Sequence, residues 1–131
     1  LRPGIKGLSE NIIVRSLVGR YLEHGRIYAF ANGGKFGSPK NVVFMSSADL
    51  MPRNLLRRVE MFVQLENATV RKQVMNQIFP ALLRDEKNCW FLQPDGSYKH
   101  PESGPDSFSA HDYFIANPSL SGAGSLAKET P

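Results

Sequence analysis

Apolar and polar residues alternate with a period of two in several stretches of the first half of the chain, which is the pattern of a β-strand with one covered face. The alternation is clearest over residues 57–66, where apolar side chains occupy every second position and Arg58 and Glu60 share the opposite face. Strands are predicted over residues 11–18, 24–31, 41–47 and 57–66, and the first of these would also tolerate a helix. The order and spacing of the first three are compatible with a meander.

One longer stretch repeats its apolar residues at intervals of three and four, as an amphipathic helix does. It spans residues 67–84, with Asn67 as a suitable N-cap and apolar residues at positions 70, 74, 75, 78, 79, 82 and 83. Pro80 lies inside this stretch and predicts a kink or an early stop. The remaining segments are a loop at 48–56 with room for one helical turn, a short strand at 88–93, and a turn at 94–97 that leads to residues 98–100. Strands and helix together predict an α/β fold.

The length of 131 residues suits one ordinary domain with its own core. We assign this domain to residues 1–100, because the composition turns to Ser, Gly, Pro and Ala beyond Pro101 and predicts a flexible tail over 101–131. The opening residues LRPG suggest the exit from an earlier segment, so we expect a piece of a longer protein. A single cysteine, Cys89, allows no internal disulfide and fits a reducing, intracellular setting.

The positive charge is concentrated in the first half of the chain. Residues 1–60 contain ten Lys and Arg against four Asp and Glu, whereas the remainder contains six basic and eight acidic residues. Such asymmetry favours an anionic partner, for example a phosphate, a nucleotide or a polyanion. A solvated basic face explains the charge equally well.

The candidate chemistry begins with His24 and Arg26, which leave the same face if residues 24–31 form a strand. An imidazole beside a guanidinium suits phosphoryl chemistry, because the arginine can bind phosphate in a bidentate manner and the histidine can act as nucleophile or proton donor. The alternative is an exposed histidine and an exposed arginine on an edge strand.

The segment SSADLMPRNLLRRVE adds further phosphate-binding candidates after a predicted strand. Ser46 and Ser47 end that strand, and Glu60 could orient the histidine ring by accepting a hydrogen bond. The donors that would converge if the loop folds over the strand end are Arg53, Asn54 and Arg58. The alternative is a pair of capping serines and a surface ion pair between Arg58 and Glu60, which would contribute little.

Other motifs are absent from the sequence: no Walker-type phosphate loop, no GxGxxG, no HExxH and no Cys/His metal spacing. We therefore expect no metal bound by the side chains of this chain. His100 and His111 lie in or next to the predicted tail and are expected to be incidental, and Cys89 is expected to be a core residue.

These residues carry a family resemblance. The motifs LRPGI, SENI, RYLEH, RIY, SSAD, PRN and RRVE follow one another with near-fixed spacing, and from residue 1 to about 100 the chain resembles the C-terminal part of bacterial polyphosphate kinase of the phospholipase D-like type. The resemblance implies an α/β fold with a mixed β-sheet and part of the second catalytic phospholipase D-like domain. It also implies that the chain is truncated.

The implied reaction is the reversible transfer of the γ-phosphate of ATP to inorganic polyphosphate through a phosphohistidine, with Mg²⁺ bound mainly by parts of the enzyme absent here. Implied partners are ATP or ADP, polyphosphate, the rest of the kinase chain and further copies in a homo-oligomer, with no specific nucleic acid. The implied location is the cytoplasm, with peripheral association with the inner membrane as an alternative. The histidine that becomes phosphorylated belongs to the preceding domain, so the isolated chain is expected to be inactive.

Carried over residue by residue, His24 matches the family's second active-site histidine, and Arg26 stands where the superfamily's His-x-Lys motif has lysine. Ser46 and Ser47 fall at the superfamily's Gly-Ser-x-Asn element. The resemblance assigns ATP or phosphate binding to His24, Arg26, Ser46, Ser47, Arg53, Asn54 and Arg58, and an orienting role to Glu60. Among the departures from the family, Leu50 replaces a usual tryptophan, and the short helix after residues 108–110 is expected to give way to the tail.

Two further functions are compatible with the same residues. A phospholipase D-like nuclease or phosphodiesterase could use His24 and Arg26 to cleave a phosphodiester without magnesium. A non-catalytic module could use the positive first half to bind a polyanion, with salt-sensitive affinity that survives the loss of His24.

Overall fold

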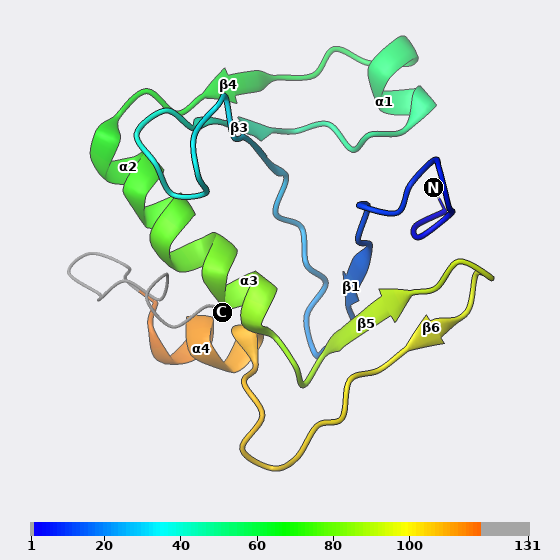
Figure 1. Cartoon of the computed structure of the whole chain (residues 1–131). Coiled ribbons are helices and arrows are strands. Elements are labelled where there is room, and N and C mark those ends of the chain that lie inside the picture. Colours follow the sequence, from blue (N-terminus) through cyan, green and yellow to red (C-terminus); the bar gives the residue numbers. More distant parts are fainter. Residues whose placement is uncertain (1, 119–131) are drawn as a thin grey trace. The chain divides into compact units, whose positions relative to one another are not determined.

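The computed structural model describes residues 2–118 (Figure 1). The described residues divide into two compact units, one formed by residues 2–23 and 81–118 and the other by residues 24–80. Each unit has its own three-stranded antiparallel sheet. The predicted α/β class is thus confirmed, whereas the predicted mixed sheet is replaced by two antiparallel sheets.

The sheet of the 24–80 unit is a meander of three strands in sequence order. Its strands are β2 (Ile27–Phe30), β3 (Val42–Ser46) and β4 (Phe62–Gln64). The register pairs Tyr28 with Phe44 and Phe44 with Gln64. All three strands lie inside predicted ones, but they are shorter, and β2 begins three residues after His24.

The two faces of this sheet differ because side chains alternate along each strand. One face packs against the helical segment that follows β4 in the chain. The buried core between them comprises Val43, Leu65, Val74 and Met75. The opposite face is aromatic, with rings in contact from Tyr28 to Phe62, from Phe62 to Phe44 and from Phe44 to Phe30. Phe30 and Phe62 are both about half exposed, at 54% and 51%.

The predicted helix forms, and its start is the predicted one. It consists of α2 (Ala68–Gln73), the π-helical segment η1 (Val74–Ile78) and α3 (Phe79–Arg84). The Asn67 side chain accepts hydrogen bonds from the backbone N–H groups of Thr69 and Val70, which makes it the N-cap.

Of the two outcomes predicted at Pro80, a kink or an early stop, the stop does not occur, because the helix continues to Arg84. The turn before the proline is widened instead: the N–H of Phe79 donates to the carbonyl of Val74, five residues earlier. A proline ring clashes with the preceding turn of a regular α-helix and has no N–H to donate. A π-type turn is one way for a helix to pass such a point.

In the other unit the sheet has the order β1-β5-β6. These strands are β1 (Arg15–Leu17), β5 (Cys89–Leu92) and β6 (Tyr98–Lys99), and Cys89 is buried as predicted. Asp85 is fully buried and accepts hydrogen bonds from Asn88 and from the N–H of Ala110. This carboxylate connects the start of β5 to the helix α4 (Ala110–Ala116).

The tail was predicted to replace the short helix that the family has after residues 108–110. This prediction is wrong, because helix α4 forms at this place. Ser109 caps it, and Ala110 and His111 are buried. The rest of the predicted tail, residues 119–131, lies outside the described part of the chain. Among the helices that the structure describes, none has the length and apolar character of a membrane span.

Candidate functional site

The candidate residues gather around the segment that connects β3 to β4, residues 47–61, which we call the β3–β4 connection. It contains the short helix α1 (Pro52–Arg57), the helical turn for which the predicted loop left room. Pro52 occupies the first turn, where a missing N–H costs nothing. All eight candidate residues belong to the 24–80 unit.

His24 and Arg26 precede β2 instead of lying within it. The strand alternation that was expected to place both side chains on one face therefore does not extend to these two residues, which lie before the paired part of β2. Arg26 is nevertheless tied to the sheet, since its carbonyl accepts a hydrogen bond from the N–H of Ser46. His24 is exposed.

A carboxylate absent from the predicted site, Asp49, connects two of the predicted arginines. Its Oδ1 lies 2.6 Å from Nε of Arg26, and its Oδ2 lies 4.0 Å from Nη2 of Arg53. The hydrogen bond from Arg26 lowers the pKa of Asp49 below its usual range, with smaller contributions from the charges of Arg26, Arg53 and His24. Asp49 and three predicted residues therefore form one electrostatic group.

Glu60 connects two other predicted residues. One of its carboxylate oxygens accepts a hydrogen bond of 2.5 Å from the Ser47 hydroxyl, and the other accepts one of 2.9 Å from Nδ2 of Asn54. These bonds lower the pKa of Glu60, the one from Ser47 contributing most. In the described part of the chain Glu60 thus accepts hydrogen bonds from Ser47 and Asn54, and its orienting role toward the ring of His24 stays a prediction.

The Ser47 hydroxyl also accepts a hydrogen bond from the N–H of Met61, so both ends of the β3–β4 connection are tied together. Asn54 is 4% exposed, and its Oδ1 is a buried acceptor without a partner among the described residues. Ser46 has a structural role: its hydroxyl donates to the carbonyl of Met61 and accepts from the N–H of Ala48. Of the two predicted serines, Ser47 is the exposed one.

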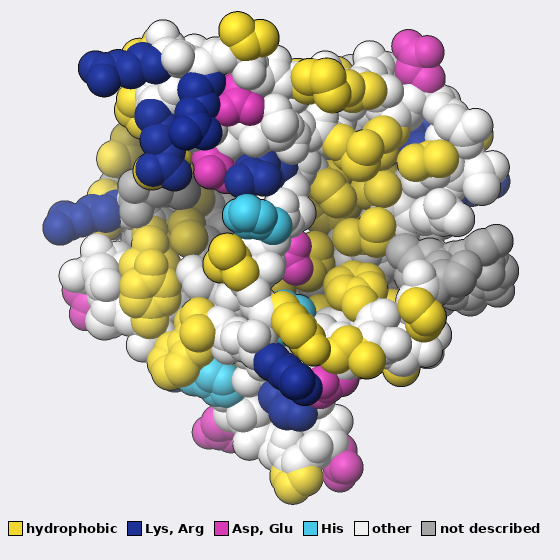
Figure 2. All heavy atoms as spheres, turned by 180° about the vertical axis from the view of Figure 1, so that it is seen from behind, with side chains coloured by type: hydrophobic (Ala, Val, Ile, Leu, Met, Phe, Trp, Pro, Cys, Tyr) yellow, Lys and Arg dark blue, Asp and Glu magenta, His cyan; other side chains and the backbone are white. Residues whose placement is uncertain are grey.

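Arg53 and Arg58 lie on the exposed surface of the β3–β4 connection. The charge of Arg58 contributes to the lowered pKa of Glu60, but the two do not form the close ion pair that the alternative interpretation required; the carboxylate is occupied by Ser47 and Asn54. Figure 2 shows Lys and Arg side chains gathered over α1, next to acidic side chains. On this surface Asp49 is the carboxylate that pairs with arginines, whereas Glu60 binds the neutral side chains of Ser47 and Asn54.

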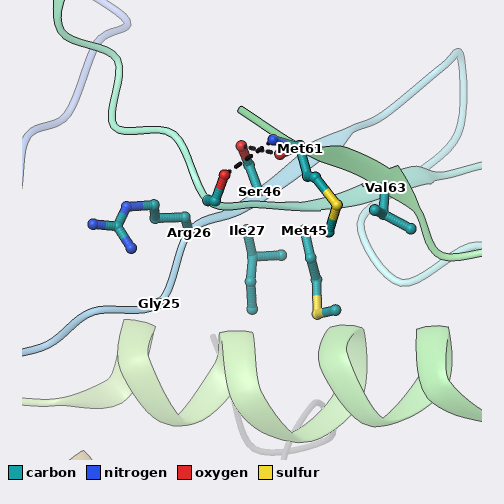
Figure 3. Close-up of a pocket in the computed structure, with 8 residues that line it drawn as sticks. Gly25, Arg26, Ile27, Met45, Ser46, Met61 and Val63 are labelled. Carbon is teal, nitrogen blue, oxygen red and sulfur yellow. Dashed lines mark hydrogen bonds between the residues drawn. The ribbon is translucent and has the colours of Figure 1, made fainter. Parts of the chain in front are cut away.

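A hollow of about 350 Å³ adjoins this group (Figure 3). Apolar side chains form most of its wall, namely Ile27, Met45, Met61 and Val63, and the remaining lining residues are Gly25, Arg26, Ser46 and Ser47. In Figure 3 the Arg26 side chain extends away from the apolar wall. The polar group and the apolar hollow thus share one border.

Asp49 is the site residue that the sequence analysis missed. It stands within the quoted motif SSAD, and an acid in a segment with Arg53, Arg57 and Arg58 is a signal that could have pointed to it. Among residues 2–118, no three His, Cys, Asp or Glu side chains gather as a metal site.

The sequence and the fold of this chain both match one family. The sequence model of the polyphosphate kinase C-terminal domain 2 matches residues 1–111. The polyphosphate kinase of Erythrobacter litoralis is 56% identical over 124 residues, which cover 95% of this chain and 17% of that protein. That of Paraburkholderia phytofirmans is 44% identical over 110 residues, covering 84% of this chain and 15% of that protein.

A solved structure agrees with the sequence relatives. The crystal structure of polyphosphate kinase from Porphyromonas gingivalis superposes with a TM-score of 0.72 at 33% identity, covering 84% of this chain and 16% of that one. The chain therefore belongs to the polyphosphate kinase family, whose named relatives are enzymes, and it carries a C-terminal domain of that family. It spans less than a fifth of the length of these relatives.

Proposed function

We propose that this chain supplies the C-terminal part of the catalytic region of a polyphosphate kinase, an enzyme that transfers the γ-phosphate of ATP reversibly to inorganic polyphosphate. The observation that carries the proposal is the group formed by Arg26, Asp49 and Arg53 beside the exposed His24. Fixed guanidinium groups next to an imidazole suit a phosphoryl group whose negative charge is spread over several oxygens.

In this proposal, the phosphoryl group passes through a phosphohistidine located in a part of the enzyme outside this chain. His24 acts on the transferring group as proton donor or electrostatic partner, while Arg26, Arg53 and Arg58 neutralise the phosphoryl oxygens. Ser47 and Asn54, held by Glu60, add hydrogen-bonding groups at the same connection.

Mg²⁺ enters with ATP as the counter-ion of its phosphates. Asp49 and Glu60, the two carboxylates of the site, already accept hydrogen bonds from Arg26, Ser47 and Asn54. This donor set does not fit a metal ligand cage, so the residues that hold the magnesium are expected in other parts of the enzyme. Assembly into a homo-oligomer and a cytoplasmic location remain predictions from the family resemblance.

The test is a chimera in which residues 1–111 replace the matching segment of the Erythrobacter litoralis polyphosphate kinase, with which the chain is 56% identical. The chimera is expected to form polyphosphate from ATP. Within it, His24→Ala should lower synthesis by at least about a hundredfold, the usual contribution of a positioned proton donor, while ATP binding weakens less. Glu102→Ala, at an exposed residue of the other unit, is the control and should leave synthesis within about twofold of the unsubstituted chimera.

Wild-type turnover in the His24→Ala chimera would exclude the assigned role. Magnesium-independent cleavage of a phosphodiester by the chimera, lost with His24, would favour the nuclease alternative. A non-catalytic polyanion module predicts a chimera without synthesis and salt-sensitive polyphosphate binding that does not depend on His24.

A further inference from the structure

Asp49 occupies an unusual place for an acid, in the middle of a group expected to bind an anion. It lies 2.6 Å from Nε of Arg26 and 4.0 Å from Nη2 of Arg53, and its side chain is 38% exposed. A carboxylate at this place repels phosphate by Coulomb's law, so its presence requires a reason other than charge.

The backbone that carries Asp49 is firmly held. The preceding residue, Ala48, is 4% exposed, its N–H donates to the hydroxyl of Ser46, and its carbonyl accepts a hydrogen bond from the hydroxyl of Tyr28. The carbonyl of Asp49 itself accepts from the N–H of Met51. The carboxylate is therefore presented from a fixed point beside the end of the sheet.

Arg26 is a long side chain whose free movement would have to stop on binding a ligand, at a cost in entropy of about 2 kcal/mol for a rotamer-rich side chain. The hydrogen bond to Asp49 engages Nε, which is one corner of the planar guanidinium. The Nη groups of the same plane then point in a direction that Asp49 defines. Restricting a binding group before the ligand arrives improves affinity, because less freedom is lost on binding.

We propose that Asp49 is a positioning residue that holds the guanidinium of Arg26, and at longer range that of Arg53, in the orientation that binds the oxygens of a polyphosphate chain. This inference rests on the proposed function, and it adds a residue to which the sequence assigned no role. It makes a prediction opposite in sign to simple electrostatics. Removing the negative charge should weaken the binding of polyphosphate, although the net positive charge of the site increases.

The experiment measures binding of inorganic tripolyphosphate to the 131-residue chain, by calorimetry and by following the Arg26 Nε–Hε signal in ¹H–¹⁵N spectra. That signal is assigned by its loss in Arg26→Lys. Asp49→Asn is expected to bind tripolyphosphate about tenfold more weakly, equivalent to about 1.4 kcal/mol, with the Arg26 Nε–Hε signal moved toward that of an unrestrained arginine. Asp49→Glu, which keeps the charge, should recover part of the affinity.

The matched control is Asp106→Asn, which makes the same change of net charge at an exposed residue of the other unit. It should leave the affinity unchanged or slightly increased. Far-ultraviolet circular dichroism is recorded for each variant, so that loss of binding can be separated from loss of fold; Asp49→Glu serves as the second variant should Asp49→Asn unfold.

Three outcomes would count against the inference, and they differ in what else they overturn. Equal or tighter binding by folded Asp49→Asn overturns the positioning role alone and leaves the proposed function intact. If Asp49→Asn is unfolded, full affinity of folded Asp49→Glu together with an Arg26 Nε–Hε signal at the unrestrained position also overturns it, because affinity would then not depend on the orientation of the guanidinium. Absence of tripolyphosphate binding by the unsubstituted chain overturns both the positioning role and the phosphate-binding part of the proposed function.

Discussion

At the scale of single residues, the two carboxylates of the site explain how a cluster of polar groups is held on a small connection. Glu60 accepts hydrogen bonds from the side chains of Ser47 and Asn54, and Asp49 accepts one from Arg26. Both carboxylates have a lowered pKa because their charged form accepts these hydrogen bonds. A group of this kind binds fewer protons in the folded chain than in the unfolded one.

The sign of the resulting pH dependence follows from this difference. A carboxylate whose pKa is lower in the folded state contributes stability above its unfolded pKa, and that contribution is lost as the pH falls through the folded pKa. We therefore expect the urea midpoint of the chain to fall steadily when the pH is lowered below about 5, the upper end of the usual carboxyl range. The urea midpoint is measured by circular dichroism against urea concentration, and the titration is repeated at several pH values.

Glu60→Gln should make this decrease shallower, because glutamine keeps the shape but cannot take up the proton. Glu102→Gln is the control, since it removes one carboxylate at an exposed residue of the other unit. An identical pH dependence for Glu60→Gln and the unsubstituted chain would show that the bonds from Ser47 and Asn54 do not favour the charged form of Glu60.

At the scale of elements, local sequence signals set the start of the long helix, and packing affects its path across Pro80. Its start follows from one side chain, because Asn67 provides an acceptor for the N–H groups of Thr69 and Val70. Its passage across Pro80 depends on the π-type turn over η1, which keeps Val74 and Met75 in the core. Proline therefore alters the winding of the helix without ending it.

Replacing the cap gives an element-scale prediction. Asn67→Ala should lower the free energy of unfolding by about 1 kcal/mol, because two N–H groups of the first turn lose their acceptor. Asn67→Asp retains an acceptor at the same place and should cost only a small part of this. Urea denaturation of the three proteins measures the difference, and equal stability of Asn67→Ala and the unsubstituted chain would contradict the capping role.

At the scale of the whole molecule, the 24–80 unit exposes apolar surface on both sides of its site. The aromatic face of the sheet leaves Phe30 and Phe62 about half exposed, and Met61 is 67% exposed at the edge of the hollow. Large exposed apolar surfaces are uncommon on proteins that act alone. They agree with the finding that the relatives are several times longer than this chain.

We expect the 131-residue chain on its own to form no polyphosphate from ATP and magnesium. It spans 17% of the Erythrobacter litoralis kinase, and the histidine proposed to carry the phosphoryl group lies elsewhere in the enzyme. The full-length relative, assayed at the same concentration, is the positive control. Formation of polyphosphate by the purified chain would refute the proposed division of the active site.

Much of the architecture could be predicted from the sequence, because strand alternation, helix periodicity and capping are properties of neighbouring residues. These properties predicted the positions of β2, β3 and β4, the helix that begins after Asn67 and the burial of Cys89. Ordered motifs along the chain also indicated the family. The lengths of the strands and the pairing of β1 with β5 were not available, since they depend on partners distant in sequence.

The tertiary structure alone decided which side chains of the site touch. Arg26 reaches Asp49, 23 residues later, because the antiparallel pairing of β2 with β3 places the carbonyl of Arg26 beside Ser46. The sequence determined the order along the chain of His24, Arg26 and a loop rich in arginine. Only the fold decided that Glu60 binds Ser47 and Asn54 while Asp49 holds Arg26, since hydrogen bonds depend on the distance between atoms and not on their separation along the chain.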